Sequence, residues 1–416
     1  MRIRSTVIAV AVAAGVLALA ACSSDSSGKA DTGPSGESGS TIKIGALTSL
    51  TGPFASSYSN FEDGVKARID MANAEGGVAG HKLTYVIADD KSAGPETVAA
   101  AEKLIQQDHV FGIVTASSSL GAAVDTLNEA KLPVIAANVG GLPDFSDPAN
   151  TGLFDVYGYG KQSVVTTTLG EYLKSQGATK IAAIGYGNSP NSKLGTQNAV
   201  ESAKAAGLEV GFFDTTLSAG STDVGPLIQK IKDSGADAVY SPVVPATGYA
   251  LVKGLARAGV HLKAAVLATG YAQAVIDDPA NREAAKGVSF MVLGSPIEAQ
   301  TAGTKEFSEA IAKYAGVTGI PDFSQYLGWM ATDAFVDGLS LPGAADDPAT
   351  FMTELRKATW DGAGLQAPIN YADVKPTKPL EDQNNCTNFV LFDGQKFTLQ
   401  GGKPVCGKVV EGVTVG

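Results

Sequence analysis

Short apolar segments alternate with helical segments along most of the chain, and this alternation begins twice. Strands are predicted at residues 42–47, 83–88, 111–114 and 133–135 in the first series, and at 181–185, 210–213, 238–240 and 265–267 in the second. Amphipathic helical patterns lie between these strands. Such alternation is typical of parallel sheets that are covered by helices on both faces. The sequence therefore predicts an α/β fold with two doubly wound lobes.

The order of elements changes after the apolar segment at 288–292. Three helical segments follow it without an intervening strand, near residues 305–314, 325–339 and 351–358. A hairpin with an Asp393-Gly394 turn is predicted at 388–399. Because consecutive helices must pack on a sheet that already exists, the chain is expected to cross between the lobes more than once. The predicted division is a signal peptide (1–21), a tether (22–40), lobe 1 (41–157 and 294–362) and lobe 2 (158–293 and 363–416).

The N-terminal segment has the pattern of a secretory signal. Arg2 and Arg4 precede an apolar run at residues 7–21, which is shorter than the roughly 20 residues of a membrane-spanning helix. Its end, Leu-Ala-Ala-Cys22, resembles a bacterial lipoprotein signal, in which the cysteine is lipidated; the alternative is a plain signal with a chance cysteine. Residues 23–40 are mostly Ser, Gly and Asp and should form a flexible tether. We expect a protein anchored by lipid on the extracytoplasmic face of the cell membrane.

Charge and composition argue against nucleic-acid binding and against catalysis. The net charge is −11 at pH 7, so a phosphate backbone would be repelled. The three histidines (His81, His109 and His261) have no metal-ligand spacing, and the nucleophile-elbow and phosphate-loop motifs are absent from the sequence. We therefore expect no catalytic residues, no cofactor and no metal. Cys386 and Cys406 predict a disulfide in an oxidising compartment, with two free thiols as the alternative.

Two segments are candidates for ligand binding. Ser117, Ser118 and Ser119 lie where a strand passes into a helix, and hydroxyls with free amide groups there suit a carboxylate. The alternative is that one of these serines only caps the helix. Residues 52–58, with Ser57 and Tyr58, follow the first strand at the carboxyl end of the sheet, where open α/β folds bind ligands.

Three features together carry a family resemblance. Ile44-Gly45-Ala46-Leu47-Thr48-Ser49-Leu50-Thr51-Gly52-Pro53, then Gly64, then Asn73-Ala74-Glu75-Gly76-Gly77-Val78-Ala79-Gly80 resemble the opening of the branched-chain amino-acid (Leu/Ile/Val) binding proteins of ABC importers. The resemblance extends from about residue 41 to residue 339. It implies the type I periplasmic-binding-protein fold, with two lobes joined by three hinge crossovers around a ligand cleft. It also implies a small-molecule ligand, a membrane permease as partner, and a monomer.

The resemblance implies a set of ligand-binding positions in this chain. They are Ser57, Tyr58, Ser117, Ser118, Ser119, Asn138, Val139, Gly140, Val244, Thr269 and Tyr271. The family's partners for the ligand ammonium are not retained: Gly140 replaces a threonine, and residues 268–271 contain no glutamate. An acid elsewhere, such as Asp90 or Glu298, would have to restore that site.

These observations lead to a functional expectation. The chain should be an extracytoplasmic solute-binding lipoprotein of an ABC importer that captures a small metabolite by hinge closure. The ligand is expected to be a small carboxylate, amide or other polar-headed apolar compound, with a branched-chain amino acid as the alternative. A ligand sensor for a signalling partner, or a surface enzyme on the same scaffold, would be different functions for the same fold.

Overall fold

The computed structural model describes residues 40–139, 141–157, 164–372 and 385–415. The predicted signal peptide, Cys22 and the tether up to residue 39 lie outside the described residues. Contacts divide the chain into two units, Met1–Ser38 and Gly39–Gly416, and all described residues belong to the second. None of the helices in the described ranges combines the length and apolar character that crossing a membrane requires.

The elements follow the predicted alternation. The strands are β1 (Thr41–Thr48), β2 (Lys82–Asp89), β3 (Gly112–Ala116), β4 (Val134–Ala136), β5 (Leu153–Asp155), β6 (Val164–Thr166), β7 (Lys180–Tyr186), β8 (Glu209–Leu217), β9 (Ala238–Ser241), β10 (Ala264–Leu267), β11 (Val288–Val292), β12 (Thr359–Trp360), β13 (Ile369–Asn370), β14 (Cys386–Phe392), β15 (Phe397–Leu399), β16 (Val405–Cys406) and β17 (Val409–Thr414). The α-helices are α1 (Ala55–Tyr58), α2 (Phe61–Ala74), α3 (Gly94–Glu102), α4 (Val124–Glu129), α5 (Thr168–Ser175), α6 (Pro190–Ala205), α7 (Gly225–Ser234), α8 (Pro245–Arg257), α9 (Gln273–Asp277), α10 (Pro279–Ala285), α11 (Ala302–Ala310), α12 (Phe323–Leu339) and α13 (Pro348–Leu355). Short 3₁₀ or π turns are η1 (Lys103–Gln107), η2 (Leu120–Ala123), η3 (Pro143–Ser146), η4 (Ile297–Ala299), η5 (Ile311–Ala315) and η7 (Gln400–Gly402).

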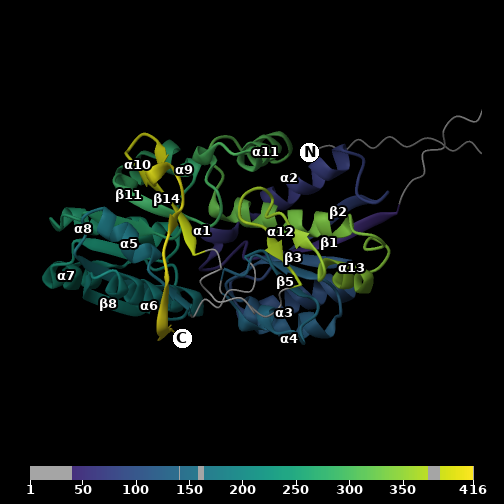
Figure 1. Ribbon diagram of the computed structural model, residues 1–416, viewed down its shortest axis with the longest axis horizontal. Coiled ribbons are helices and arrows are strands. Elements are labelled where there is room, and N and C mark those ends of the chain that lie inside the picture. The colour runs from purple at the N-terminus through teal and green to yellow at the C-terminus, as the bar shows by residue number, and fades with distance from the viewer. Residues whose placement is uncertain (1–39, 140, 158–163, 373–384, 416) are drawn as a thin grey trace, which may run out of the picture. The chain divides into compact units, whose positions relative to one another are not determined.

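The first sheet is parallel, with the strand order β2-β1-β3-β4-β5. Ile44 and Ala46 of β1 belong to an apolar layer with α2 and α12, whereas Leu47 belongs to the opposite layer with α3 and α4 (Figure 1). The strand order reverses between β1 and β3. Loops that leave the carboxyl ends of strands at such a switch point form the usual ligand crevice of open α/β sheets.

Helices α2 and α12 approach each other closely on one face of this sheet (Figure 1). A Cβ atom added to Gly64 of α2 would lie 2.3 Å from the carbonyl oxygen of Gln325, and one added to Gly328 would lie 2.1 Å from that of Phe61. Both contacts are with backbone, which no rotamer change can relieve. The two glycines therefore set the distance between the helices.

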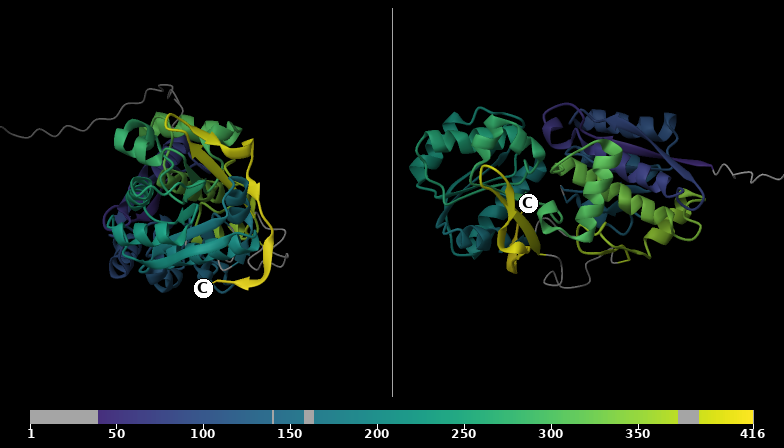
Figure 2. Two further views of the ribbon diagram at one scale, coloured as in Figure 1. Left: turned by 90° about the vertical axis from the view of Figure 1, so that its left-hand side faces the viewer. Right: turned by 90° about the horizontal axis from the view of Figure 1, so that it is seen from above.

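The second sheet has the order β15-β14-β11-β10-β9-β7-β8, and β16 pairs with β14. Strands β7 to β11 are parallel, while the predicted C-terminal hairpin adds β14 and β15 in antiparallel fashion (Figure 2). Its switch point lies between β7 and β9. One face carries α5 and α6, and the other carries α7 and α8.

The chain passes between the two sheets at three places; the order of elements predicts more than one crossing, and the family resemblance implies three. The crossings fall between β5 and α5, between β11 and α11, and between β13 and β14. The last one comes later than predicted: the rings of Phe154 and Tyr371 are 5.4 Å apart, and Gln366 Nε2 donates to the carbonyl oxygen of Val156. Residues up to Tyr371 therefore stay with the first sheet. The predicted boundary at residues 362–363 was too early because the short β12–β13 ribbon gives no clear strand signal.

The C-terminal segment is cross-linked. Cys386 of β14 and Cys406 of β16 are paired residues of adjacent strands, and their sulfur atoms are bonded. The two cysteines are separated by 20 residues in the sequence. In the chain-entropy model, a disulfide that closes a loop of this length adds about 3 kcal/mol to the free energy of unfolding. The last strand, β17, pairs with β6, which begins the part of the chain that follows the first crossing.

Candidate ligand-binding site

A cavity of about 330 Å³ is lined by segments that follow strands of both sheets. From the first sheet, the lining residues are Phe54, Ser57, Tyr58, Ser118, Val139 and Phe323. The second sheet contributes residues that follow β7, β9, β10 and β11, together with one face of α6. Both switch points therefore open into the same cavity, as expected for a ligand site of this fold.

Six of the positions predicted to bind ligand lie on the wall of this cavity. Ser57, Tyr58, Ser118, Val139, Val244 and Thr269 line the cavity. Ser117, Ser119, Asn138 and Tyr271 do not line it, and Gly140 lies outside the described residues.

The three consecutive serines after β3 have different roles. Ser117 Oγ donates a hydrogen bond to the carboxylate of Asp90 and accepts one from the backbone N–H of Ser119 at 3.0 Å. Ser118 Oγ is buried beside the cavity and has no partner among the described residues. Ser57 Oγ is in the same situation. Since buried polar groups are normally hydrogen-bonded, these two hydroxyls are the groups that a ligand's polar head would satisfy.

Asn138 and Tyr271 are occupied by structural contacts. Asn138 Oδ1 accepts from the backbone N–H of Leu142 at 2.9 Å, which closes the loop after β4. The Tyr271 hydroxyl donates to Glu298 Oε2 at 2.5 Å and accepts from the backbone N–H of Ile297 at 3.2 Å. The sequence cannot distinguish a cavity residue from one that supports a neighbouring loop at these positions.

The acids that could have paired with an ammonium group are engaged elsewhere. The buried carboxylate of Asp90 accepts from Ser49 Oγ at 2.6 Å, from the backbone N–H of Ser92 at 2.8 Å and from Ser117. Glu298 is held by Tyr271, and its burial raises its pKa. Neither acid lines the cavity, and no Asp, Glu, Lys, Arg or His is among the described residues that do. The described lining residues would therefore offer an ammonium group in this cavity no counter-charge.

The ring of Tyr186 and helix α6 form a part of the wall that was not among the predicted binding segments, whereas Phe54 lies in the predicted segment 52–58. The rings of Phe54 and Tyr186, which follow β1 and β7, meet edge to face with centroids 6.1 Å apart. α6 begins directly after the β7 loop, where Ser189 Oγ accepts from the backbone N–H of Ser192 and Pro190 takes the first helical position. The Ser189-Pro190 pair is a helix-start signal. This pair alone predicts that a helix begins just after β7, at the second switch point.

Asp155, at the end of β5, is a buried acid beside the loop that carries Val139. Burial raises the pKa of Asp155 to about 7, although hydrogen bonds from the backbone N–H groups of Tyr157 (2.9 Å) and Asn138 (3.4 Å) act in the opposite direction. Between the ordinary carboxyl pKa near 3.9 and this value, the folded chain holds a proton that the unfolded chain has lost. Asp155 therefore makes its full contribution to the free energy of unfolding at low pH, and this contribution falls as the pH rises from about 4 to about 7.

Asp155→Asn should remove this pH dependence, because an amide resembles the protonated acid and still accepts from Tyr157. The variant should match the parent near pH 4 and exceed it near pH 8 by on the order of 3 kcal/mol in the free energy of unfolding. Urea unfolding across this pH range measures the difference. Two parallel stability curves would show that Asp155 titrates normally in the folded chain.

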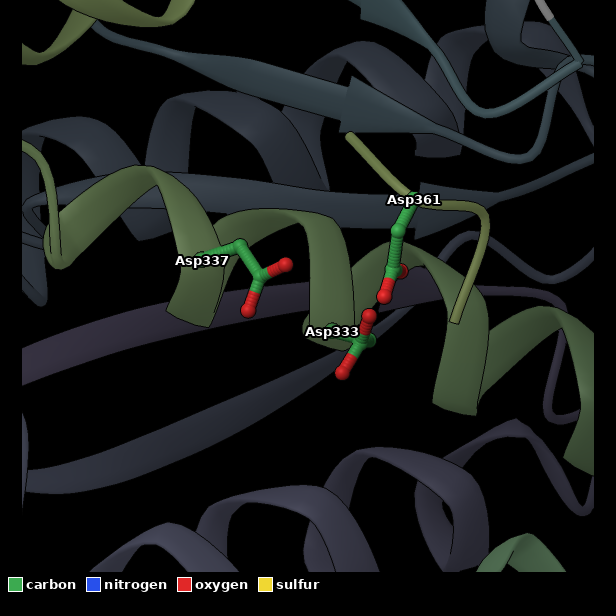
Figure 3. Close-up of side chains that lie close together, drawn as sticks. All are labelled: Asp333, Asp337 and Asp361. Atoms are coloured by element: carbon green, nitrogen blue, oxygen red, sulfur yellow. The ribbon is translucent and has the colours of Figure 1, made fainter. Parts of the chain in front are cut away.

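Three carboxylates gather on α12 and the following segment, away from the cavity. Figure 3 shows Asp333 and Asp337 one turn apart, with Asp361 beside them, and one oxygen of each lies within 4.8 Å of the others. Arg68 Nε donates to Asp333 Oδ1 at 2.6 Å, and Trp360 Nε1 donates to Asp333 Oδ2 at 2.8 Å. The guanidinium supplies positive charge, so the cluster is an ion-pair network that joins α2 to α12. Burial, followed by the nearby charge of Asp333, raises the pKa of Asp337 to about 7.

A family model described as "Periplasmic binding protein" matches residues 41–380. Among curated relatives, a Leu/Ile/Val-binding protein homolog 3 of Brucella melitensis is 28% identical over 229 residues, which cover 53% of this chain and 59% of the relative. The match thus spans little more than half of that relative's length.

Solved structures of low sequence identity share the fold over most of their length. A solute-binding protein of an ABC transporter from R. palustris, in complex with benzoate, aligns with a TM-score of 0.71 and 18% identity, covering 90% of this chain and 98% of that one. A fatty acid ABC transporter substrate-binding protein from Thermomonospora curvata aligns with a TM-score of 0.67 and 17% identity, covering 89% and 92%.

Proposed function

The chain belongs to the periplasmic binding protein family and has its type I fold, and we propose that it is the solute-binding protein of an ABC importer. The two lobes, residues 41–157 with 294–371 and residues 164–293 with 385–415, close over the ligand in this proposal. A cavity that both sheets line supports it. The permease of the importer is the proposed protein partner, and the chain acts as a monomer.

The proposed ligand is a carboxylate with an apolar body, rather than leucine, isoleucine or valine. One observation carries this choice: the cavity offers the two buried hydroxyls of Ser57 and Ser118 without partners, yet no charged side chain among its described lining residues. Hydroxyls donate to a carboxylate in charge-assisted hydrogen bonds. An ammonium group buried there would find no charged partner among the described lining residues, and leaving it unpaired would cost several kcal/mol. The benzoate named for the R. palustris protein is a ligand of the proposed chemistry.

Matched ligand pairs test this proposal. Isothermal titration of the full chain, freed of any retained solute, should show binding of isocaproate, isovalerate and benzoate, and much weaker binding of leucine and valine. Ser57→Ala and Ser118→Ala should each weaken carboxylate binding about tenfold to a hundredfold, because each removes a hydrogen bond to a charged group. Ser59→Ala, at an exposed neighbouring position that does not line the cavity, is the matched control. Tight binding of leucine or valine, with no response to the deaminated acids, would contradict the assignment.

We also propose that the chain is a lipoprotein, attached through Cys22 to the extracytoplasmic face of the cell membrane. The apolar run that ends in Leu-Ala-Ala-Cys22 and the polar segment after it support the proposal. Cys22→Ala should release the processed protein into the soluble fraction or leave it unprocessed, because it removes the site of acylation. Fractionation with mass analysis of the N-terminus distinguishes these results. A processed Cys22→Ala protein that stays with the membrane would exclude lipid attachment at this cysteine.

A further inference from the structure

The cavity extends along most of the length of α6. Its wall includes a stripe of residues on one side of this helix, at positions 191, 195, 198 and 202, with 192 and 199 beside them. From Asn191 to Ser202 the helix rises about 16 Å. Ser57 and Phe54 lie near the N-terminal end of the stripe, because the Phe54 ring meets Tyr186, whose backbone N–H donates to Ser192 Oγ at 2.9 Å. The cavity is therefore elongated, and we call its part beside positions 195–202 the α6 arm.

The far end of the α6 arm is apolar. Ser202 Oγ there accepts from the backbone N–H of Gly170. Much of the remaining wall belongs to one apolar cluster, made by Leu169, Ala199, Tyr240, Met291 and Phe389, and Asn198 is a polar lining residue of the same arm. This end lies in the interior of the second lobe, between α6, α5 and the sheet.

Several hydroxyl groups of the cavity wall already have protein partners. Ser192 Oγ donates to the carbonyl oxygen of Pro242 at 2.6 Å, Thr168 Oγ1 to that of Asn385 at 2.6 Å, and Thr269 Oγ1 to that of Val243 at 2.6 Å. Such groups make no demand on a ligand. Ser57 and Ser118 differ because their hydroxyls are buried and lack partners among the described residues. The two unpartnered hydroxyls thus come from segments of the first sheet, whereas the wall along α6 is made largely of apolar side chains, with Asn198 and the Tyr240 hydroxyl as polar groups.

The volume of the cavity exceeds what a compact ligand needs. An apolar cavity of about 150 Å³ is sufficient to hold benzene. The present cavity measures about 330 Å³, so a single ring with a carboxylate would leave the arm beside α6 unfilled. Unfilled apolar volume forfeits contacts and hydrophobic transfer energy that a longer ligand would gain.

We propose that the natural ligand is a carboxylate with an extended, unbranched apolar tail, whose head is held by Ser57 and Ser118 and whose tail lies in the α6 arm. This inference rests on the proposed function, and it specifies the shape of the ligand's apolar body. A medium-chain fatty acid, or an aryl acid with an alkyl substituent, has this chemistry. Compact acids such as benzoate occupy only the head end and bind more weakly.

A homologous series of straight-chain acids tests the inference in the full, ligand-free chain. From butanoate to octanoate, titration calorimetry should show a gain of about fourfold in affinity for each added methylene, which corresponds to ~0.8 kcal/mol of buried methylene. The total gain is roughly two-hundredfold over four methylenes. Binding of all carboxylates, benzoate included, with no dependence on chain length would overturn the tail site and leave the proposed function standing. Failure of every carboxylate to bind would overturn the proposed function itself.

Gly195→Val tests directly whether the ligand's tail lies in the α6 arm. A Cβ atom at Gly195 would lie 3.6 Å from Pro242 and 3.8 Å from the Tyr240 hydroxyl, so it fits without a clash and directs the valine methyls into the α6 arm. The variant should bind butanoate like the parent and octanoate at least about tenfold more weakly. Lys193→Val, at an exposed position of α6 that does not line the cavity, controls for effects on the helix and should behave like the parent.

Met291→Ala enlarges the α6 arm, whereas Gly195→Val fills it. The second variant keeps the test decisive if valine at position 195 disturbs folding. Met291 lines the far part of the cavity, so its truncation lengthens the arm. Decanoate should then gain affinity relative to octanoate. Unchanged chain-length profiles in both Gly195→Val and Met291→Ala would show that the tail lies outside the α6 arm.

Discussion

Gly64→Ala should lower the free energy of unfolding by about 3 kcal/mol, at the upper end of the range for overpacked sites. The added methyl would lie 2.3 Å from the carbonyl oxygen of Gln325 and 2.4 Å from the amide nitrogen of Trp329. Because both atoms belong to the backbone of α12, one helix must move for the methyl to fit. Interiors packed at crystal-like density have little room for such a movement. Urea unfolding followed by circular dichroism measures the loss.

Gly195→Ala is the matched control for this prediction. The nearest neighbours of a Cβ atom at Gly195, inside α6, are side-chain atoms of Pro242 at 3.6 Å, an ordinary contact distance. In a helix, alanine is more favourable than glycine by up to about 1 kcal/mol, and the control should be neutral or slightly stabilising. If Gly64→Ala proves as stable as Gly195→Ala, the close contact between α2 and α12 does not limit the packing.

Arg68→Met should destabilise the chain by about 3–5 kcal/mol at pH 8, because it leaves the buried carboxylate of Asp333 without its counter-charge. The Arg68 side chain is about one-tenth exposed, as is that of Asp333, its partner at 2.6 Å. Asp337 lies 3.8 Å from the guanidinium. At pH 5 the loss should shrink, since the pKa of Asp337, raised to about 7, lets that carboxyl hold a proton and so removes part of the unpaired charge. Denaturation at pH 5 and pH 8 measures both effects.

Two further variants test the cause of this loss. Arg68→Met combined with Asp333→Asn and Asp337→Asn should recover much of the stability, since replacing a whole buried ion cluster is far less harmful than removing one partner. Lys103→Met breaks a pair with Asp108 whose lysine side chain is 48% exposed, and it should change stability by no more than about 1 kcal/mol. Equal losses in the free energy of unfolding for Arg68→Met and Lys103→Met would mean that the Arg68 network stabilises the chain no more than an exposed ion pair does.

The fold could be predicted from sequence where strands are long and apolar. The alternation gave both sheets, and the three late helices were placed near α11, α12 and α13. Most of the missed strands are short: β5 has three residues, and β12 and β13 have two each, whereas β17 has six. β6 pairs with β17, which lies more than two hundred residues later. A strand of this kind is defined by its distant partner, and local periodicity carries no information about it.

The site was predictable to the level of segments, but not of individual side chains. Three adjacent serines look alike in the sequence, and the structure selects Ser118 because Asp90, at the end of another strand, engages Ser117. The wall on α6 was missed for a related reason. Small residues such as Gly195 and Ala199 at helical spacing suit close packing as well as an empty cavity, and only the surrounding elements decide between them.

The engagement of Asp90 has a consequence for how binding proteins with this scaffold can be redesigned. One carboxylate ties the loop after β1, through Ser49, to the loop after β3, through Ser117. Asp90 thus holds together the loops that carry Ser57 and Ser118, and Asp90 itself is not among the described residues that line the cavity. The α6 arm, by contrast, is formed by a helix that packs on the second sheet, and the hydrogen bonds of Asp90 do not involve it. An engineer building a fluorescent biosensor could therefore vary Gly195 or Met291 to retune solute length while the recognition of the acid group stays intact.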